Sequence, residues 1–366
     1  MLFRSICAGG TGGGVYPALA VHNALTTRRP GVETLWVGGE GGMEEELVKR
    51  AGISFRSIPA AGVHGVGLRA LPGNLAKLSR GVVASRRILH DFRPDVLFFT
   101  GGYVAFPMAF AGRKVPTLLY VPDIEPGLAL KAVARFADRL TVTAEASKEY
   151  FPSKQRIVVT GYPLRADLKG WSRQSGSQRL GLSDDLPALL VTGGSKGART
   201  INNAVLAHLP ALLEMAQVVH ITGSLDWPAV EAVAKNLPNP LADRYHAMPY
   251  LHEMGAALSA ADLVVSRAGA SSLGEYPFFG LPAILVPYPY AWRYQKVNAE
   301  ALSRHGAAIL LEDHLMQERL FPLVRDLLND PAKREAMRAS MRTLAQPDAA
   351  GAIASQLLEL AGETPL

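Results

Sequence analysis

The sequence predicts a doubly wound α/β protein built from two Rossmann-like halves. Short apolar runs, most of them ending in glycine, recur along the 366 residues, and each is followed by a stretch of helical period. The runs are "LFRSICAGG", "ETLWVGG", "DVLFFTGG", "PTLLYVP", "RLTVTAE", "ALLVTGG", "QVVHITG", "DLVVSRAG" and "PAILVPY". Because they are apolar throughout rather than alternating, they are typical of parallel strands covered by helices on both faces. The stretch "SICAGGTGGGVYPALAV" resembles "LLVTGGSKGARTINNAV" from Leu189, which indicates that one strand, glycine and helix unit occurs twice.

The repeat also predicts where the chain divides. Charge, serine and glycine accumulate in "VTGYPLRADLKGWSRQSGSQRLGL", just before the second copy begins. We therefore expect an N-terminal domain over residues 1–163 and a C-terminal domain over residues 164–347. Parallel sheets bind ligands at the carboxyl ends of their strands, so the site is expected in the cleft where the two halves face each other.

Composition narrows the class of protein. The chain is 48% hydrophobic and 19% charged, which is ordinary for a globular protein of two domains. Its only cysteine, Cys7, excludes a disulfide framework and a cysteine metal site, and favours the cytoplasm. Arg4 interrupts the first apolar stretch, so no targeting segment is expected. The longest uncharged run, residues 96–112, is broken by Gly101, Gly102 and Pro107 and is predicted to be strand, turn and helix rather than a membrane span.

Positive charge is concentrated in residues 61–115. Eight basic residues stand there against Asp91 and Asp95, an excess equal to the net charge of +6. The basic residues are Arg69, Lys77, Arg80, Arg86, Arg87, Arg93, Arg113 and Lys114. Leucine and valine alternate with these cations at helical spacing, which suits a helix lying on an anionic membrane; a core helix with a solvated basic face is the alternative. No aromatic residue interrupts the basic stretch "LRALPGNLAKLSRGVVASRRIL" and no nucleic-acid-binding signature occurs, so no nucleic acid partner is expected.

Three glycine-rich loops stand where a strand passes into a helix. They cover residues 9–14, 101–102 and 193–197. Glycine lets backbone N–H groups approach an anion while the helix N-terminus adds partial positive charge, so each loop is a candidate phosphate site. None matches a nucleotide-binding fingerprint, since Val15 stands where G-x-G-x-x-G requires glycine. Tight turns remain the alternative.

A fourth segment, "SRAGASSLGEYPFFGLPAILVPYPYAWRYQKVNAEAL", combines such a helix start with polar side chains. Glu275 follows the helix start and could accept hydrogen bonds from ribose hydroxyls. Gln295 and Asn298 are three residues apart and so share a helix face, which suits recognition of sugar hydroxyls; surface amides without a ligand are the alternative.

Taken in order, these motifs resemble the MurG-type glycosyltransferases of the GT-B fold. The similarity runs over nearly the whole chain, through "GGTGGGVYPALA", "MEEELVKRAGI", "TGGYVAFP", "TGYPLR", "GGSKGARTIN", "SRAGASSLGE" and "GLPAILVPYPYAWRYQKVNA". The resemblance implies two Rossmann-like domains facing a cleft, with the last helix, about 348–366, packing back on the N-terminal domain. It assigns acceptor and membrane to that domain and the UDP-sugar to the other.

The resemblance also implies the reaction. N-acetylglucosamine would pass from UDP-N-acetylglucosamine to the 4-hydroxyl of the muramyl sugar of lipid I, with inversion, giving lipid II for peptidoglycan. The acceptor is linked to undecaprenyl diphosphate, so the enzyme is expected at the cytoplasmic face of the membrane, bound peripherally. No cofactor or metal is expected. The pair Asp184 and Asp185 precedes a strand and is interpreted as a solvated turn rather than a metal motif.

Matching the motifs residue by residue implies two sets of site residues. The donor-binding residues are Arg165, Ser195, Leu251, Gly269, Ala270, Ser271, Glu275, Gln295 and Asn298. The residues that hold the acceptor diphosphate are Gly10, Thr11, Gly12, Gly13, Gly14, Gly101, Gly102 and Tyr103. Leu251 would lie by the uracil, residues 269–271 would meet the UDP diphosphate, and Glu275 would take the ribose.

The catalytic base is missing from its usual place. Gly14 stands where the pattern Gly-Gly-Thr-Gly-Gly-His-Val has histidine, and residues 120–123 read Tyr-Val-Pro-Asp instead of His-Glu-Gln-Asn. Asp123 or Glu125 is therefore a candidate base, the alternative being a loop carboxylate or helix cap. The histidine of the family could also be only an assistant in catalysis.

These departures keep other functions open. One is a related GT-B glycosyltransferase with a different glycolipid or small-molecule acceptor. A second is a catalytically impaired protein that binds UDP-sugars or lipid diphosphates, and a third is a nucleotide-sugar epimerase. His220, His246 and His252 occur singly and are expected to be structural.

Overall fold

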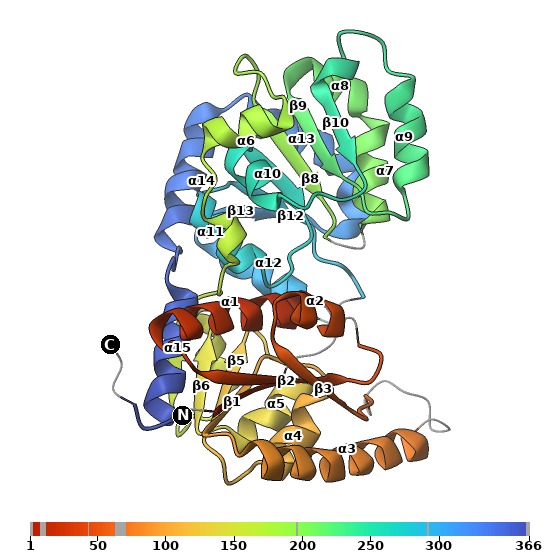
Figure 1. Ribbon diagram of the computed structural model, residues 1–366. Coiled ribbons are helices and arrows are strands. Elements are labelled where there is room, and N and C mark those ends of the chain that lie inside the picture. Colours follow the sequence, from red (N-terminus) through yellow and green to blue (C-terminus); the bar gives the residue numbers. More distant parts are fainter. Residues whose placement is uncertain are drawn as a thin grey trace. The chain divides into compact units, whose positions relative to one another are not determined.

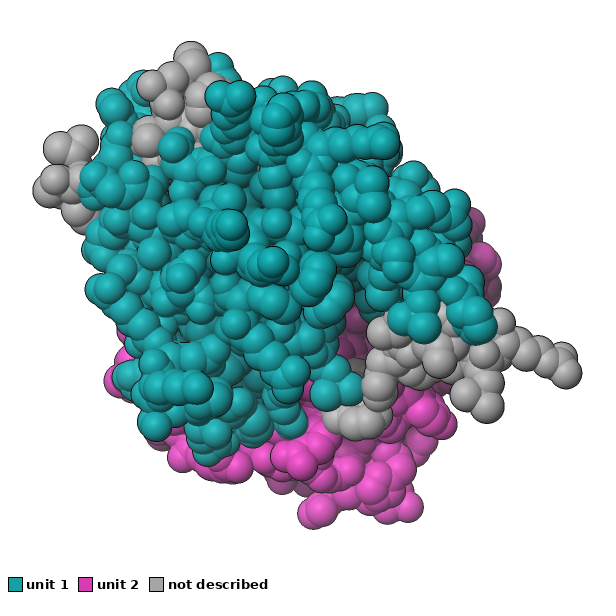
Figure 2. Space-filling view, turned by 90° about the horizontal axis from the view of Figure 1, so that it is seen from below, with its two compact units in different colours: residues 1–165, 347–366 teal, residues 166–346 magenta. Residues whose placement is uncertain are grey.

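The chain forms two compact units. The computed structural model describes residues 3–7, 12–42, 44–62, 71–194, 197–290 and 293–363 (Figure 1). Unit 1 comprises Met1–Arg165 and Pro347–Leu366, and unit 2 comprises Ala166–Gln346 (Figure 2). Each unit contains one parallel sheet, so the predicted α/β class with two Rossmann-like halves is confirmed.

The sheet of unit 1 has seven strands in the order β3-β2-β1-β4-β5-β6-β7. The strands are β1 (Phe3–Cys7), β2 (Glu33–Gly39), β3 (Ser54–Ile58), β4 (Val96–Phe99), β5 (Thr117–Val121), β6 (Arg139–Val142) and β7 (Ile157–Val159). Every residue of β4, β5 and β6 is buried, as the continuous apolar runs predict. The connections leave β1 and β4 in opposite directions, which makes the carboxyl ends of these two strands the topological switch point.

The helices of unit 1 cover both faces of this sheet. They are α1 (Gly12–Arg28), α2 (Glu44–Arg50), α3 (Leu71–Phe92), α4 (Ala105–Ala111), α5 (Leu128–Val133) and α15 (Ala349–Leu360). The uncharged run at residues 96–112 forms β4, a turn and α4, as expected. Among the described helices, none is long and apolar enough to cross a membrane.

The last helix, α15, belongs to unit 1 and packs along α1 (Figure 1). Leu25 of α1 shares a small apolar cluster with Ala354 and Leu358. Two charged contacts flank that cluster: Arg28 Nη2 lies 3.0 Å from Asp348 Oδ2, and the nearly buried Arg139 lies 2.5 Å from a carboxylate oxygen of Glu359. The C-terminal segment therefore completes the core of the N-terminal half.

The sheet of unit 2 has six strands in the order β10-β9-β8-β11-β12-β13. They are β8 (Ala188–Thr192), β9 (Gln217–Ile221), β10 (Tyr245–Met248), β11 (Leu263–Ser266), β12 (Ala283–Leu285) and β13 (Ala308–Leu310). The helices are α6 (Arg173–Leu180), α7 (Arg199–Ala207), α8 (Leu209–Met215), α9 (Trp227–Lys235), α10 (Met254–Ala260), α11 (Ser272–Phe279), α12 (Tyr294–Arg304), α13 (Met316–Leu328) and α14 (Pro331–Thr343). Here the switch point lies between β8 and β11.

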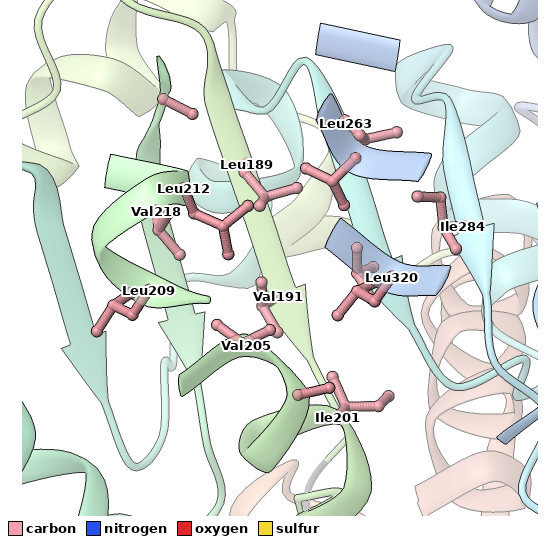
Figure 3. Packing of buried hydrophobic residues seen from close by; sticks show 14 of the residues in the cluster. Leu189, Val191, Ile201, Val205, Leu209, Leu212, Val218, Leu263, Ile284 and Leu320 are labelled. Atoms are coloured by element: carbon pink, nitrogen blue, oxygen red, sulfur yellow. The ribbon is translucent and has the colours of Figure 1, made fainter. Parts of the chain in front are cut away.

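One face of this second sheet is packed by α7, α8 and α13 (Figure 3). Leu189 and Val191 are two residues apart on β8, so they point to the same face, where Val205 and Leu212 meet them. Leu320 of α13 closes the cluster. Burying this apolar area fixes the strands whose carboxyl ends form the candidate site.

A buried polar network supports the end of β9 in unit 2. His220 is fully buried; its Nε2 lies 3.0 Å from Asn202 Oδ1 and its Nδ1 lies 2.8 Å from the Tyr245 hydroxyl. Asn202 Nδ2 in turn donates to the Thr222 carbonyl at 2.9 Å. Burial lowers the pKa of His220 from 6.5 to about 4, so the imidazole is neutral at pH 7. His220 is thus a structural residue, as expected.

This network predicts an acid-sensitive unit 2. The pKa of His220 is lower in the folded protein than in the unfolded chain, so the unfolded state takes up the proton first as the pH falls. Stability is therefore full above about pH 6.5 and is lost progressively toward pH 4, by roughly 3 kcal/mol from this group. Measured by urea unfolding at several pH values, the His220→Gln variant should show a smaller loss over this window than the wild type. Equal losses in the two proteins would contradict the assignment.

Candidate functional site

The loops after β8 and β11 meet at the switch point of unit 2. The strands are parallel neighbours, pairing Thr192 with Ser266 at their carboxyl ends. The first loop contains two glycines that the backbone requires. A Cβ on Gly193 would overlap the backbone nitrogen of Ala198, and one on Gly197, whose φ is +76°, would overlap the carbonyl oxygen of Thr222. Ser195 lies outside the described residues, so its predicted contact with UDP stays a prediction.

The second loop opens α11, the helix of the "SRAGASSLGE" motif. Helical hydrogen bonding begins at the N–H of Ser272, which donates to the Gly269 carbonyl at 3.0 Å, followed by Leu273 to Ala270 at 3.1 Å. The N–H groups of residues 269–271 therefore precede the helix, at its partially positive end. A Cβ on Gly269 would have no neighbouring atom within 4 Å, so packing does not demand glycine there. This is the geometry of an anion site.

Glu275 stands one turn into α11. Its N–H donates to the Ser271 carbonyl at 2.8 Å, and the residue is half-buried. The structure therefore brings Glu275 and residues 269–271 to one end of one helix, as the sequence predicts. A carboxylate can accept hydrogen bonds from both hydroxyls of a ribose, and this role of Glu275 stays a prediction.

The two amides of α12 shape the loops around α11. Asn298 is fully buried and its Nδ2 donates to the Ala268 carbonyl at 3.1 Å, directly before the glycine of the helix start. Gln295 Oε1 accepts the Tyr288 N–H at 2.8 Å. Asn298 thus holds the backbone that leads into residues 269–271, which are called the cradle below. Direct contact of either amide with a sugar stays a prediction.

Sequence reasoning missed Arg267, the residue that joins most parts of this site. Its guanidinium forms an ion pair with Asp313 and donates to Thr200 Oγ1 at 2.8 Å and to the Val286 carbonyl at 3.2 Å. It also lies 5.3 Å from the ring centre of Tyr288. The side chain is only 10% exposed. One buried cation therefore ties the ends of β11 and β12 to the start of α7.

Two further donor residues of the prediction belong to other segments of the chain. Leu251 follows β10, between Tyr250 and His252, whose rings pack edge to face with centres 4.8 Å apart. Arg165 ends the first segment of unit 1, and its guanidinium lies 4.9 Å from the ring centre of Tyr16 in α1. Their approach to a bound nucleotide stays a prediction.

The switch point of unit 1 carries the predicted acceptor residues. Gly10 and Thr11 lie outside the described residues, whereas residues 12–14 form the first turn of α1 rather than a loop. Thr100 Oγ1 donates to the Gly14 carbonyl at 2.8 Å and so ties α1 to the end of β4. Gly101 and Gly102 follow with φ of +127° and +84°.

Tyr103, the last of these acceptor residues, is 59% exposed. Its ring lies so close to Gly62 that a Cβ there would be 2.7 Å from the ring carbon Cε1. Among the residues that the structure describes, the turn at Gly101 and Gly102, the exposed Tyr103 ring and the start of α1 therefore lie at the carboxyl ends of the central strands.

The two candidate bases follow β5 and differ in their surroundings. Asp123 is half-buried at the carboxyl end of the strand. Glu125 is 9% exposed, and its Oε1 lies 3.9 Å from Lys131 Nζ. A half-buried carboxylate is better placed to meet a substrate than one buried beside a cation. Across the described residues, no three His, Cys, Asp or Glu side chains gather into a metal-binding set.

Comparison with known proteins agrees with these motifs. Residues 5–142 match the glycosyltransferase family 28 N-terminal domain, and residues 188–353 match the glycosyltransferase family 28 C-terminal domain. A relative from Roseiflexus sp. (strain RS-1) is 40% identical over 95% of this chain and 93% of its own length. One from Desulforudis audaxviator (strain MP104C) is 39% identical over 98% of both chains. Both are named UDP-N-acetylglucosamine--N-acetylmuramyl-(pentapeptide) pyrophosphoryl-undecaprenol N-acetylglucosamine transferase.

A solved structure is similar over the same length. The crystal structure of MurG from Acinetobacter baumannii is 27% identical, with a TM-score of 0.76, over 98% of this chain and all of that one. The GT-B fold expected from the sequence is thereby confirmed. With family matches in both halves and relatives of about 40% identity along nearly its whole length, this chain belongs to glycosyltransferase family 28.

Proposed function

We propose that this protein transfers N-acetylglucosamine from UDP-N-acetylglucosamine to the muramyl sugar of an undecaprenyl-diphosphate-linked acceptor, the reaction for which its relatives are named. The observation that carries the proposal is the start of α11, where the N–H groups of residues 269–271 and the residue Glu275 lie at the same end of one helix. That pair of features suits a nucleoside diphosphate. Unit 2 is then the donor domain and unit 1 the acceptor domain.

The donor side would act by stabilising the leaving group. As the bond between the anomeric carbon and UDP breaks, negative charge grows on the diphosphate. Backbone N–H groups at a helix N-terminus are already oriented toward that charge and need no reorganisation, and no metal is required. Arg267 and Asn298 hold the cradle in place from the protein side.

The acceptor side needs a group to take a proton. The 4-hydroxyl of the muramyl sugar would attack the anomeric carbon from the face opposite UDP, forming the new C–O bond with inversion and releasing its proton. Gly14 has no side chain for this purpose. We assign the proton to the Asp123 carboxylate, because Glu125 is buried beside Lys131.

The surface of α3 fits contact with an anionic membrane at the cytoplasmic face. Leu75 and Val83 are 51% and 50% exposed on this helix. The exposed cations on the same helix are Lys77, Arg80, Arg86 and Arg87. Each such cation near an anionic bilayer contributes about 1 kcal/mol, so the helix could hold the protein peripherally beside its lipid-linked acceptor.

One observation favours a second candidate. Residues 120–122 read Tyr-Val-Pro and depart from the family pattern on the acceptor side, while the donor motifs largely agree with it. A related glycosyltransferase that uses the same donor and a different acceptor would also keep the donor motifs and change the acceptor motifs. Product identification separates the two candidates.

The first prediction concerns transfer itself. Incubated with UDP-N-acetylglucosamine and a soluble lipid I analogue, the wild type should yield the β-1,4 disaccharide, identified by mass spectrometry. Asp123→Asn should lower kcat by about 10²- to 10⁴-fold, because an amide cannot take the proton. Asp91→Asn, a change of the same kind at an exposed carboxylate of α3, serves as the control. Near-wild-type turnover of Asp123→Asn would remove Asp123 as the base.

A companion variant asks whether the loop histidine matters here. Gly14→His restores the residue of the family pattern. If Asp123 takes the proton, turnover of Gly14→His should stay within a few fold of the wild type. A large gain in turnover would show instead that the wild-type protein has no effective catalytic base and that the introduced histidine supplies one.

The second prediction concerns the cradle. Gly269→Ala adds a methyl group that touches no protein atom within 4 Å, so the free energy of unfolding should stay unchanged. The methyl would stand beside the N–H groups offered to the diphosphate, and KM for UDP-N-acetylglucosamine should rise about tenfold. Gly170→Ala, equally without neighbours, is the matched control in the same unit. Unchanged KM would place the diphosphate elsewhere.

The third prediction concerns α3. Lys77→Gln with Arg80→Gln should weaken sedimentation with phosphatidylglycerol vesicles, and 0.5 M salt should weaken that of the wild type, since the attraction is electrostatic. The control is Lys235→Gln with Arg304→Gln, which removes equal charge from helices of unit 2. Equal binding by both pairs would disprove a role for α3.

A further inference from the structure

Two buried hydroxyls, those of Tyr120 and Thr143, lie next to the backbone that leads into Asp123. β5 and β6 are parallel neighbours in a register that pairs Tyr120 with Thr141. Thr143, just past the end of β6, therefore lies beside the residues that follow β5. Tyr120 is fully buried and Thr143 is 6% exposed. Neither side chain can reach a substrate from this position.

The directions of their hydrogen bonds follow from the proton count. Thr143 Oγ1 lies 2.7 Å from the Tyr120 hydroxyl and 2.8 Å from the Pro122 carbonyl oxygen. Carbonyls can only accept, so the threonine hydroxyl donates to Pro122, with the Val121 carbonyl a longer second acceptor at 3.3 Å, and the phenol donates to Thr143. Burial, together with the nearby Tyr162 phenol and Asp123 carboxylate, raises the pKa of Tyr120 well above its usual value. The phenol thus keeps the proton that it donates.

The series of hydrogen bonds from Tyr120 through Thr143 ends at the Pro122 carbonyl oxygen, which belongs to the peptide bond between Pro122 and Asp123. Holding that oxygen holds the plane of the peptide bond between Pro122 and Asp123. The proline ring fixes its own φ near −65°, and it keeps Val121 extended. Two covalent restraints and a two-step hydrogen-bond chain therefore act on the backbone immediately before Asp123.

We propose that Tyr120 and Thr143 form a positioning brace that orients the Asp123 carboxylate toward the acceptor hydroxyl. The inference rests on the proposed function, in which Asp123 takes the proton. Tyr120 and Pro122, two of the residues that depart from the family pattern, then act together. They make the backbone before Asp123 rigid, and Asp123 supplies the carboxylate. The brace itself exchanges no proton with substrate.

The direct test removes the hydroxyl that bonds the Pro122 carbonyl. Thr143→Val keeps the shape of the side chain, and kcat should fall about tenfold or more, because small misplacements of a reacting group are costly. KM for UDP-N-acetylglucosamine should not change, since the donor cradle is in unit 2. Thr143→Ser should restore kcat, and Tyr120→Phe should lower it less, because Thr143 can still donate to Pro122.

Thr141 offers a matched control. It lies two residues before Thr143 on the same side of β6, it is fully buried, and within the described part of the chain its hydroxyl has no hydrogen-bond partner. Thr141→Val therefore removes a buried threonine hydroxyl beside Tyr120 that makes no hydrogen bond to the brace, and kcat should stay at the wild-type value. A fall equal to that of Thr143→Val would show a general packing effect and overturn the proposal.

A double-mutant cycle with Asp123→Asn decides whether the brace acts through Asp123. Thr143→Val should lower kcat about tenfold in the wild-type background and less than twofold in the Asp123→Asn background. Equal falls in both backgrounds would overturn the brace and leave the proposed transfer intact. Absence of product from the wild type would instead overturn the proposed function, and the brace with it. If Thr143→Val does not fold, the same cycle is run with Tyr120→Phe, which keeps the packing of the ring.

Discussion

In the proposed function, the donor half depends on the N–H groups of residues 269–271, which precede α11, being turned toward the UDP diphosphate. These groups have no partner within the helix, so their orientation must come from outside it. Asn298 supplies it by bonding the carbonyl of Ala268, and Ser272 by bonding that of Gly269. On the neighbouring strand, a Cβ on Gly193 would overlap the backbone nitrogen of Ala198, so the start of the first loop requires glycine. The proposed cradle is thus a backbone site whose flanking carbonyls are held by the side chains of Asn298 and Ser272.

The buried pair of Arg267 and Asp313 belongs to the same construction. An ion pair at this depth contributes little net stability, because desolvation offsets most of the attraction. Removing one partner, however, would leave a buried charge unpaired. The value of Arg267 lies in its geometry, because one planar guanidinium contacts Asp313, Thr200 and the end of β12 at once. It fixes the spacing between elements that come from three separate parts of the sequence.

The sequence predicted the features that are local in the chain. Continuous apolar runs became fully buried strands, and the repeated glycine unit became the switch point of each sheet. The helix start at residues 269–271 and its Glu275 came together because they are adjacent in sequence. Arg267 was missed because its partner Asp313 lies 46 residues away. Tyr120 and Thr143 were missed for the same reason, since 23 residues and a strand register separate them. The start of α1 at Gly12 also differed from the expected loop, and there the Gly14 carbonyl is held by Thr100, 86 residues away in the sequence.

The two halves of the site differ in how far they can change, and the chemistry gives the reason. In glycosyl transfer the greatest new charge appears on the departing diphosphate, so the N–H cradle carries most of the stabilisation and its geometry is strict. Proton removal from the attacking hydroxyl requires only a basic group within hydrogen-bond reach, and it contributes a smaller share of the rate. A carboxylate on one strand end can therefore replace an imidazole on another, provided that the backbone beneath it is rigid. By the resemblance of its motifs, this chain keeps residues 269–271 and departs from the family pattern at Gly14, Tyr120, Pro122 and Asp123, which the proposed function places on the acceptor side. The constraint on the donor side is electrostatic and fixed by UDP, whereas the constraint on the acceptor side is one of position, which different residues can meet.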